Sequence, residues 1–320
     1  MPKKKILEQT IVRGAKPSAR PSARQAPPAA RIAPPTVPGR WILGAFLIVV
    51  AAAALCGWGS LCLLFWQGYW QLLYHPAAKI VRTPASVGLA FDPVGFDDTD
   101  AGQPMLRGWW IAAAPEAQFG RYTVLYLHGQ NGNLSNCVEA LAALHAAGVN
   151  VFAFDYRGYG QSEFARPSEK RWREDAGSAL AYLTGTRQIP SKAIVLDGAD
   201  LGANLALEVA AAHPALAGVV LDTPLEAPMN AVFEDPRARL VPAHLFAGEN
   251  YALDKPASRL RIPSLWFVTA SEGNSKPGKA PKAYNEVSSP KMLVWLAGSG
   301  GRNKNYSDSL ARWLDGLSGR

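Results

Sequence analysis

Asp200 is a residue whose type and position suit chemistry, because it follows an apolar run closely and lies midway between Gly198 and Gly202. Glycines favour turns and loops, and a carboxylate on such a loop can act as a metal ligand. His128 is a second candidate, since histidine is the most frequent general base and this one follows an apolar run.

Other carboxylates could join Asp200 in a metal site, namely Asp222, Glu226 and Glu272. No histidine or cysteine accompanies them, and the whole chain has only three cysteines. This is not the ligand pattern of a thiolate or imidazole metal centre, and three cysteines also exclude a disulfide scaffold. We therefore expect no metal ion and no other cofactor.

Short apolar runs alternate with helical patterns from about residue 90 onward. The predicted strands cover residues 106–112, 123–127, 150–154, 193–196, 218–221, 264–269 and 292–296. The predicted helices cover residues 135–147, 168–183, 202–212 and 306–317. Apolar strands separated by helices are typical of a mostly parallel sheet that is covered on both faces. We therefore predict a doubly wound α/β domain over residues 91–320, with a short cap insertion at residues 223–260.

His128, Asp155 and Asp200 each follow a predicted strand directly or within a few residues. In a parallel sheet the carboxyl ends of the strands share one edge, and open α/β sheets bind their ligands there. The three residues are therefore expected at the same edge of the sheet.

Two loop motifs carry a family resemblance, LHGQNGN at residues 127–133 and DYRGYGQS at residues 155–162. They are similar to loops of the α/β-hydrolase superfamily. Together with LYHP at residues 73–76, they resemble its membrane-anchored, serine-aminopeptidase-like branch, which includes acyl-protein-thioesterase relatives. The resemblance covers about residues 70 to 317. It implies an oxyanion hole from the backbone N–H groups of Gln130 and Leu201, on turns shaped by His128 and Gly129.

The positions that would hold a catalytic triad depart from the family pattern. The family's Gly-x-Ser-x-Gly elbow contains Asp200 in place of serine. Arg302 stands where the family has histidine, and arginine stays protonated and cannot act as a general base. The acid position falls on Gly273, with Glu272 as the nearest carboxylate. We expect Asp200 and Arg302 to form an ion pair in place of the serine–histidine contact.

A triad works as a unit, so the change of all three positions indicates that hydrolase chemistry has been lost. The sequence therefore favours a non-catalytic binding or scaffolding protein, with a protein partner or a small acyl or peptide ligand. The alternative is an active hydrolase of ester, thioester or amide bonds that uses Asp200, as aspartate serves in epoxide-hydrolase-type relatives.

The positive charge of the chain is confined to its first 40 residues, which hold nine Lys and Arg but only one acid, Glu8. The formal net charge is +8, so the other 280 residues are neutral overall. The neutral body excludes a basic nucleic-acid-binding face on composition alone. Because residues 1–40 are also rich in proline and poor in apolar clusters, we predict a disordered basic tail.

Residues 41–66 contain no charged side chain and are long enough to cross a bilayer. A secretory signal has a shorter apolar region of about 7–15 residues, and a buried core helix would have a polar residue on some face. We predict one transmembrane helix, followed by a membrane-proximal linker at residues 67–90. The basic tail favours a cytoplasmic N-terminus and an extracytoplasmic C-terminal domain, periplasmic in a Gram-negative cell.

Overall fold

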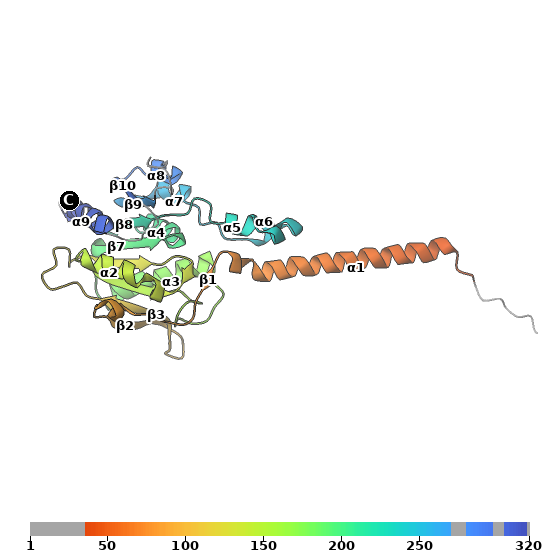
Figure 1. Cartoon of the computed structure of the whole chain (residues 1–320), viewed down its shortest axis with the longest axis horizontal. Coiled ribbons are helices and arrows are strands. Elements are labelled where there is room, and N and C mark those ends of the chain that lie inside the picture. Colours follow the sequence, from red (N-terminus) through yellow and green to blue (C-terminus); the bar gives the residue numbers. More distant parts are fainter. Residues whose placement is uncertain (1–35, 270–279, 297–303, 319–320) are drawn as a thin grey trace, which may run out of the picture. The chain divides into compact units, whose positions relative to one another are not determined.

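A computed structural model describes the backbone of residues 36–269, 280–296 and 304–318 (Figure 1). Its contacts divide the chain into a unit ending at Ala53 and a larger unit from Ala54 to Arg320. The larger unit contains the sheet, its covering helices and the C-terminal end of the long first helix. The features that concern function lie in this larger unit.

The central sheet has eight strands in the order β10-β9-β8-β7-β4-β6-β3-β2. All neighbours pair in parallel except β2 with β3 and β3 with β6, which are antiparallel. This order confirms the predicted mostly parallel α/β sheet. The strands are β2 (Asp92–Asp98), β3 (Pro104–Ile111), β4 (Thr123–Leu127), β6 (Asn150–Asp155), β7 (Ile194–Ala199), β8 (Gly218–Asp222), β9 (Ser264–Thr269) and β10 (Lys291–Leu296).

Helices cover both faces of this sheet, as a doubly wound fold requires. The side chains of α2 (Val138–Ala146) and α9 (Lys304–Ser318) share one buried cluster with residues of the central strands. Those of α3 (Glu169–Ala181), α4 (Leu201–Ala212), α7 (Asp254–Arg259) and α8 (Lys282–Glu286) belong to the other cluster.

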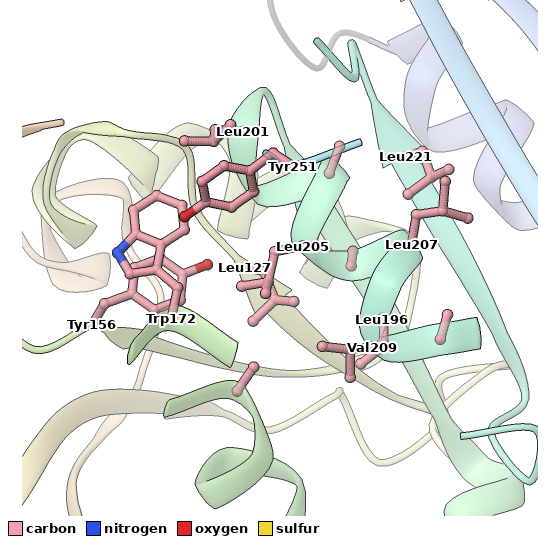
Figure 2. Packing of buried hydrophobic residues seen from close by; sticks show 14 of the residues in the cluster. Leu127, Tyr156, Trp172, Leu196, Leu201, Leu205, Leu207, Val209, Leu221 and Tyr251 are labelled. Carbon is pink, nitrogen blue, oxygen red and sulfur yellow. The ribbon is translucent and has the colours of Figure 1, made fainter. Parts of the chain in front are cut away.

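The best-buried helix is α4, which packs against β7 and β8. Figure 2 shows Leu205, Leu207 and Val209 of this helix among Leu127, Leu196 and Leu221 of the strands. An apolar helix buried along most of its length fixes its first turn firmly in the core. The residue that precedes α4 is Asp200.

Short elements connect the larger ones. They are the helical turns η1 (Tyr69–Leu72), η2 (Pro84–Val87), η3 (Leu134–Cys137), η4 (Tyr182–Thr186) and η5 (Ser191–Ala193), and the small strand pair β1 (His75–Pro76) with β5 (Asn131–Gly132). The cap insertion contains α5 (Asn230–Phe233), η6 (Pro236–Leu240) and α6 (Ala243–Phe246), followed by α7. It contains no strand, and in Figure 1 the α5–α6 segment extends away from the sheet.

The first helix, α1 (Gly39–Gly68), has 30 residues. Its first turn contains no acidic side chain, and its last turn contains no basic one. Together with η1 it is long and apolar enough to cross a membrane. Its apolar side chains are largely exposed in this structure. Length and composition alone would also suit a signal sequence.

The segment at residues 67–90, expected from the sequence to be a linker, packs into the domain. Leu73 and Tyr74 are buried, and the hydroxyl groups of Tyr74 and Tyr251 lie 2.8 Å apart in a hydrogen bond. His75 pairs with Asn131 in the β1–β5 ladder. This segment therefore contributes to the core of the α/β domain.

Candidate functional site

Asp200 occupies a strand-to-helix turn between the last residue of β7 and the first residue of α4. Its backbone dihedral angles are φ +50° and ψ −121°, a combination that residues other than glycine rarely adopt. A methyl group on Gly202 would overlap the carbonyl oxygens of Leu127 and His128, and one on Gly198 would overlap the carbonyl of Gly202. The two glycines thus allow α4 to begin directly against β4 and β7.

The loop after β4 meets this turn. The backbone N–H of Leu201 donates a hydrogen bond of 3.3 Å to the side-chain oxygen Oε1 of Gln130. The Asp200 carboxylate lies close to Gly129. A methyl group on Gly129 would be only 3.1 Å from Asp200 Oδ2. The structure therefore brings together Asp200, Leu201, Gly129 and Gln130.

The backbone of Gln130 is held from two sides. Its carbonyl accepts hydrogen bonds of 2.9 Å from the His75 backbone N–H and from the Tyr159 hydroxyl. With the backbone fixed in this way, the side-chain amide can reach the first turn of α4. The amide oxygen of Gln130 then accepts the hydrogen bond of the Leu201 N–H group. The family resemblance assigns this N–H group to an oxyanion hole.

His128 is fully buried next to this loop. Its Nδ1–H donates a 2.7 Å hydrogen bond to the carbonyl of Gly129, and its ring packs among those of Tyr156, Tyr159 and Trp172. Burial lowers the pKa of His128 to about 4, so the imidazole is neutral near neutral pH. Its position and contacts are those of a core residue that shapes the loop.

Asp155, at the end of β6, lies next to His128 at the edge of the sheet. The sequence did not identify Asp155 as a partner of His128. Its Oδ1 accepts a 2.8 Å hydrogen bond from the Leu134 N–H and lies 3.6 Å from His128 Nε2. Burial raises the pKa of Asp155 to about 7. The two residues meet because β4 pairs in parallel with β6, which places the residues at the ends of both strands side by side.

Asp222, at the end of β8, also lies next to the elbow. Its backbone carbonyl accepts a 2.9 Å hydrogen bond from the Asp200 N–H, and its side-chain Oδ1 accepts one of 3.1 Å from the Thr223 hydroxyl. Glu226 lies further along, where its carboxylate accepts a 3.1 Å hydrogen bond from the Lys282 N–H. Among the described residues no group of three or more His, Cys, Asp or Glu side chains could hold a metal ion.

Two of the predicted site residues, Glu272 and Arg302, lie outside the described residues. The predicted ion pair between Asp200 and Arg302 therefore stays a prediction.

A cavity of about 580 Å³ lies between the cap and the end of the domain that carries α8. Three carboxylates (Glu226, Glu249 and Asp254) and one lysine, Lys282, line it together with apolar side chains. Neither Asp200 nor Gln130 contributes to its lining. The cavity is therefore separate from the elbow.

The strand order, the elbow before α4 and the loop that faces it are those of the α/β-hydrolase fold. A family model described as alpha/beta hydrolase fold matches residues 122–319, and the chain belongs to this family.

Several relatives have no assigned activity. The chain is 35% identical over 179 residues to the uncharacterized protein Rv2307c of Mycobacterium tuberculosis, a match that covers 56% of this chain and 61% of that protein. It is 34% identical over 137 residues to the uncharacterized protein YfhR of Salmonella typhimurium, covering 41% and 43% of the two chains. A match to the alpha/beta hydrolase domain-containing protein WAV2 of Arabidopsis thaliana is 32% identical and covers 38% of each chain. The chain thus spans about three fifths or less of these curated relatives.

Solved structures share the fold at low sequence identity. The esterase Pf2001 of Pyrococcus furiosus superposes with a TM-score of 0.56 at 17% identity, covering 77% of this chain and 98% of the esterase. An alpha-beta hydrolase from Vibrio vulnificus has a TM-score of 0.53 at 20% identity, covering 73% and 82%. An acetyl xylan esterase from Paenibacillus sp. R4 also has a TM-score of 0.53, at 19% identity, covering 79% and 93%. These similarities extend the fold assignment to most of the domain.

Proposed function

We propose that this protein is a membrane-anchored, non-catalytic member of the α/β-hydrolase family that binds a ligand or a protein partner. The observation that carries the proposal is the state of the elbow. Asp200 stands at the position of the nucleophile, and the Gln130 amide oxygen accepts the hydrogen bond of Leu201 N–H. The backbone of the elbow is retained, while the Gln130 side chain contacts the Leu201 N–H group at its start.

These contacts oppose acyl transfer for two reasons. An oxyanion hole requires N–H donors that are free to meet the developing negative charge, and the Gln130 side chain uses one of them. In addition, an acyl group transferred to Asp200 would form a mixed anhydride, and a base would be needed to activate the water that hydrolyses it, whereas no histidine follows His244 in the sequence. Arg302, at the position of the family histidine, cannot take that role.

The cavity of about 580 Å³ supports a binding role for the cap side of the domain. Its wall combines Met229 and Phe233 with Glu226, Glu249 and Asp254. Apolar side chains with a few charged groups are the usual composition of a small-ligand site. The excess of carboxylates favours a ligand that joins an apolar or acyl part to a cationic group, such as a peptide with a free amine.

The membrane anchor of this proposal is α1. Its exposed apolar side chains would be solvated by lipid, and the basic residues before it favour a cytoplasmic N-terminus. The α/β domain would then lie on the opposite side of the membrane.

A hydrolase that uses Asp200 is the second candidate, favoured by the retained backbone of the elbow and by the esterases among proteins of the same fold. Turnover of an activated ester separates the two candidates. The full chain in detergent should hydrolyse p-nitrophenyl acetate no faster than Asp200→Ala. Turnover that is abolished in Asp200→Ala, and kept in the control Asp100→Asn at an exposed turn residue, would replace the binding proposal with the enzymatic one.

The binding role has its own test. A fluorescent octanoyl peptide with a free amine should bind the full chain, and Asp254→Asn together with Glu226→Gln should weaken the affinity. The same double variant should not change binding of an acetylated peptide without a cationic group. Equal affinity of the wild type and the double variant for the cationic probe would contradict the proposal that this cavity binds the ligand.

A further inference from the structure

Beyond α1, four large apolar side chains of the described residues are strongly exposed: Val81 (68%), Phe164 (95%), Leu240 (62%) and Leu245 (82%). Single exposed apolar residues are common on soluble proteins. What sets three of these apart is their location, because Phe164, Leu240 and Leu245 belong to two segments that hydrogen-bond to the C-terminal part of α1.

The first segment is the cap around η6 and α6. The indole Nε1–H of Trp58 on α1 donates a 3.0 Å hydrogen bond to the backbone carbonyl of Leu240. Leu245 follows in α6, within the same short insertion. The cap is therefore joined to the helix at a point ten residues before the end of α1 at Gly68.

The second segment is the loop that carries Phe164. Arg166 donates a 3.2 Å hydrogen bond from Nη2 to the carbonyl of Trp66, and its guanidinium lies 5.2 Å from the ring centre of Tyr69. Phe164 is two residues away and projects into solvent. Val81 has a different setting, since its backbone N–H donates to the Ser135 hydroxyl, away from α1.

The length of α1 indicates where these segments lie relative to a bilayer. Its 30 residues extend about 45 Å, whereas the hydrocarbon core is about 30 Å thick. About ten residues therefore exceed the span. With Arg40 at the cytoplasmic face, the hydrocarbon ends near residue 60, which places Trp58 at the far interface, where tryptophan is favoured. The carbonyl of Leu240 is then at the same level.

The surface between the cap and α1 is itself apolar. A cavity of about 260 Å³ is lined by Leu61, Leu64 and Phe65 of the helix and by Leu240 and Val241 of the cap. Arg237 also lines this cavity, and its guanidinium is paired with Asp235. An open apolar surface next to a membrane span is suited to contact with acyl chains.

We infer that Leu240, Leu245 and Phe164 form a membrane collar, a surface that inserts into the extracytoplasmic leaflet beside α1. The occupant of this surface is membrane lipid. The inference depends on the proposed membrane anchor and adds a second, peripheral contact to it. Leu240 lies deeper than Phe164, because Trp58 precedes Trp66 by about 12 Å along the helix. Leu245 follows Leu240 in the same cap. The collar would hold the domain in one orientation on the bilayer.

Depth-dependent fluorescence quenching in vesicles tests this inference. The full chain with Cys56→Ala, Cys62→Ala and Cys137→Ala is given one cysteine at a time by Leu240→Cys, Leu245→Cys or Phe164→Cys and is labelled with an environment-sensitive dye. Vesicles of phosphatidylethanolamine and phosphatidylglycerol contain lipids with a quencher on the acyl chain. Val81→Cys is the matched control, because Val81 is an equally exposed apolar residue in a segment that is not bonded to α1.

Labels at residues 240 and 245 should shift to the blue and lose emission to the lipid quencher, with a smaller loss at residue 164. The label at residue 81 should lose none. A further label, from Leu47→Cys within α1, reports the anchor itself. Quenching at residue 47 without quenching at residues 240 and 245 overturns the collar and leaves the anchor in place. An absence of quenching at residue 47 overturns both. A blue shift at residue 240 without lipid quenching would indicate a protein partner in place of lipid and would also overturn the collar.

Discussion

Gly202 fixes the backbone of the elbow, because a side chain there would overlap the carbonyls of Leu127 and His128. We expect Gly202→Ala to lower the free energy of unfolding by about 1–3 kcal/mol, since the start of α4 would have to move away from β4. The measurement is urea unfolding of the full chain in detergent. Gly177→Ala is the control, because Gly177 lies within α3 with open space around its Cα. That variant should be more stable by up to about 1 kcal/mol, and a similar loss in both variants would contradict the close approach at Gly202.

The buried pair of His128 and Asp155 makes opposite contributions to the pH dependence of stability. The pKa of His128 falls to about 4 in the folded state, so this residue reduces stability as the pH drops from about 6.5 to 4. The pKa of Asp155 rises to about 7, so the folded state retains a proton that the unfolded chain loses above pH 3.8, and stability falls as the pH rises toward 7.

Asp155→Asn removes only the second contribution and keeps an oxygen for the Leu134 N–H. Relative to the wild type, the variant should therefore gain stability as the pH rises from about 4 to 7, by at most about 1.4 kcal/mol per pH unit. Urea unfolding at a series of pH values measures this difference. Asp100→Asn, a change at an exposed turn residue, should follow the wild-type profile. A constant difference between Asp155→Asn and the wild type at all pH values would show that Asp155 is ionised in the folded protein.

At the residue scale, the sequence predicted which backbone positions form the elbow and its facing loop, because glycine spacing encodes tight turns. It did not predict that the Gln130 side chain would turn back to Leu201, since the direction of a side chain depends on contacts from distant segments. Those contacts come from His75 and Tyr159, which hold the Gln130 carbonyl. The His128–Asp155 pair was missed for a similar reason, because it depends on the order of strands in the sheet.

At the scale of elements, the chain directly after α1 is fastened to the cap through Tyr74 and Tyr251, whose buried hydroxyls share a hydrogen bond. We expect Tyr74→Phe to cost about 1–3 kcal/mol, because it leaves the Tyr251 hydroxyl buried without this partner. The double variant Tyr74→Phe/Tyr251→Phe should cost less than the sum of the single variants, since neither hydroxyl is then left over. Unfolding of the three variants in detergent measures the coupling, and strictly additive costs would rule out the interaction.

The strands β4 and β9 have the bounds expected from the sequence, because each is a short run of apolar or β-branched residues. In contrast, β2 was not predicted: its sequence, DPVGFDD, contains proline, glycine and three aspartates. Only Phe96 of this strand is buried, and the strand pairs on one side with β3. An edge strand with a solvated face tolerates such a composition, so its pairing depends on the neighbouring strand more than on its own residues.

At the scale of the whole molecule, the direction of the chain across the membrane is the main expectation. Eight basic residues and one acidic residue precede α1, and Arg40 lies in its first turn, which favours a cytoplasmic N-terminus. Alkaline phosphatase fused after Arg320 should therefore be active in a bacterial host, and a cytoplasmic reporter at the same position should be inactive. Replacement of Lys3, Lys4 and Lys5 by glutamine should reduce the fraction with this orientation. The reverse pattern of reporter activities would contradict the orientation, and loss of the protein to the soluble fraction would contradict the anchor.

The turn at Asp200 also bears on how an enzyme of this fold can lose its catalytic activity and keep its structure. Packing of Gly202 against β4 holds the backbone in place whatever side chain stands at position 200. The backbone of Asp200, with φ +50° and ψ −121°, lies outside the left-handed α region in which aspartate is enriched, so the surrounding packing maintains this turn. A change of side chain at position 200 would therefore leave the architecture intact. A protein of this fold that gave up the reaction in this way would inherit a folded domain, whose surfaces are free to acquire another use.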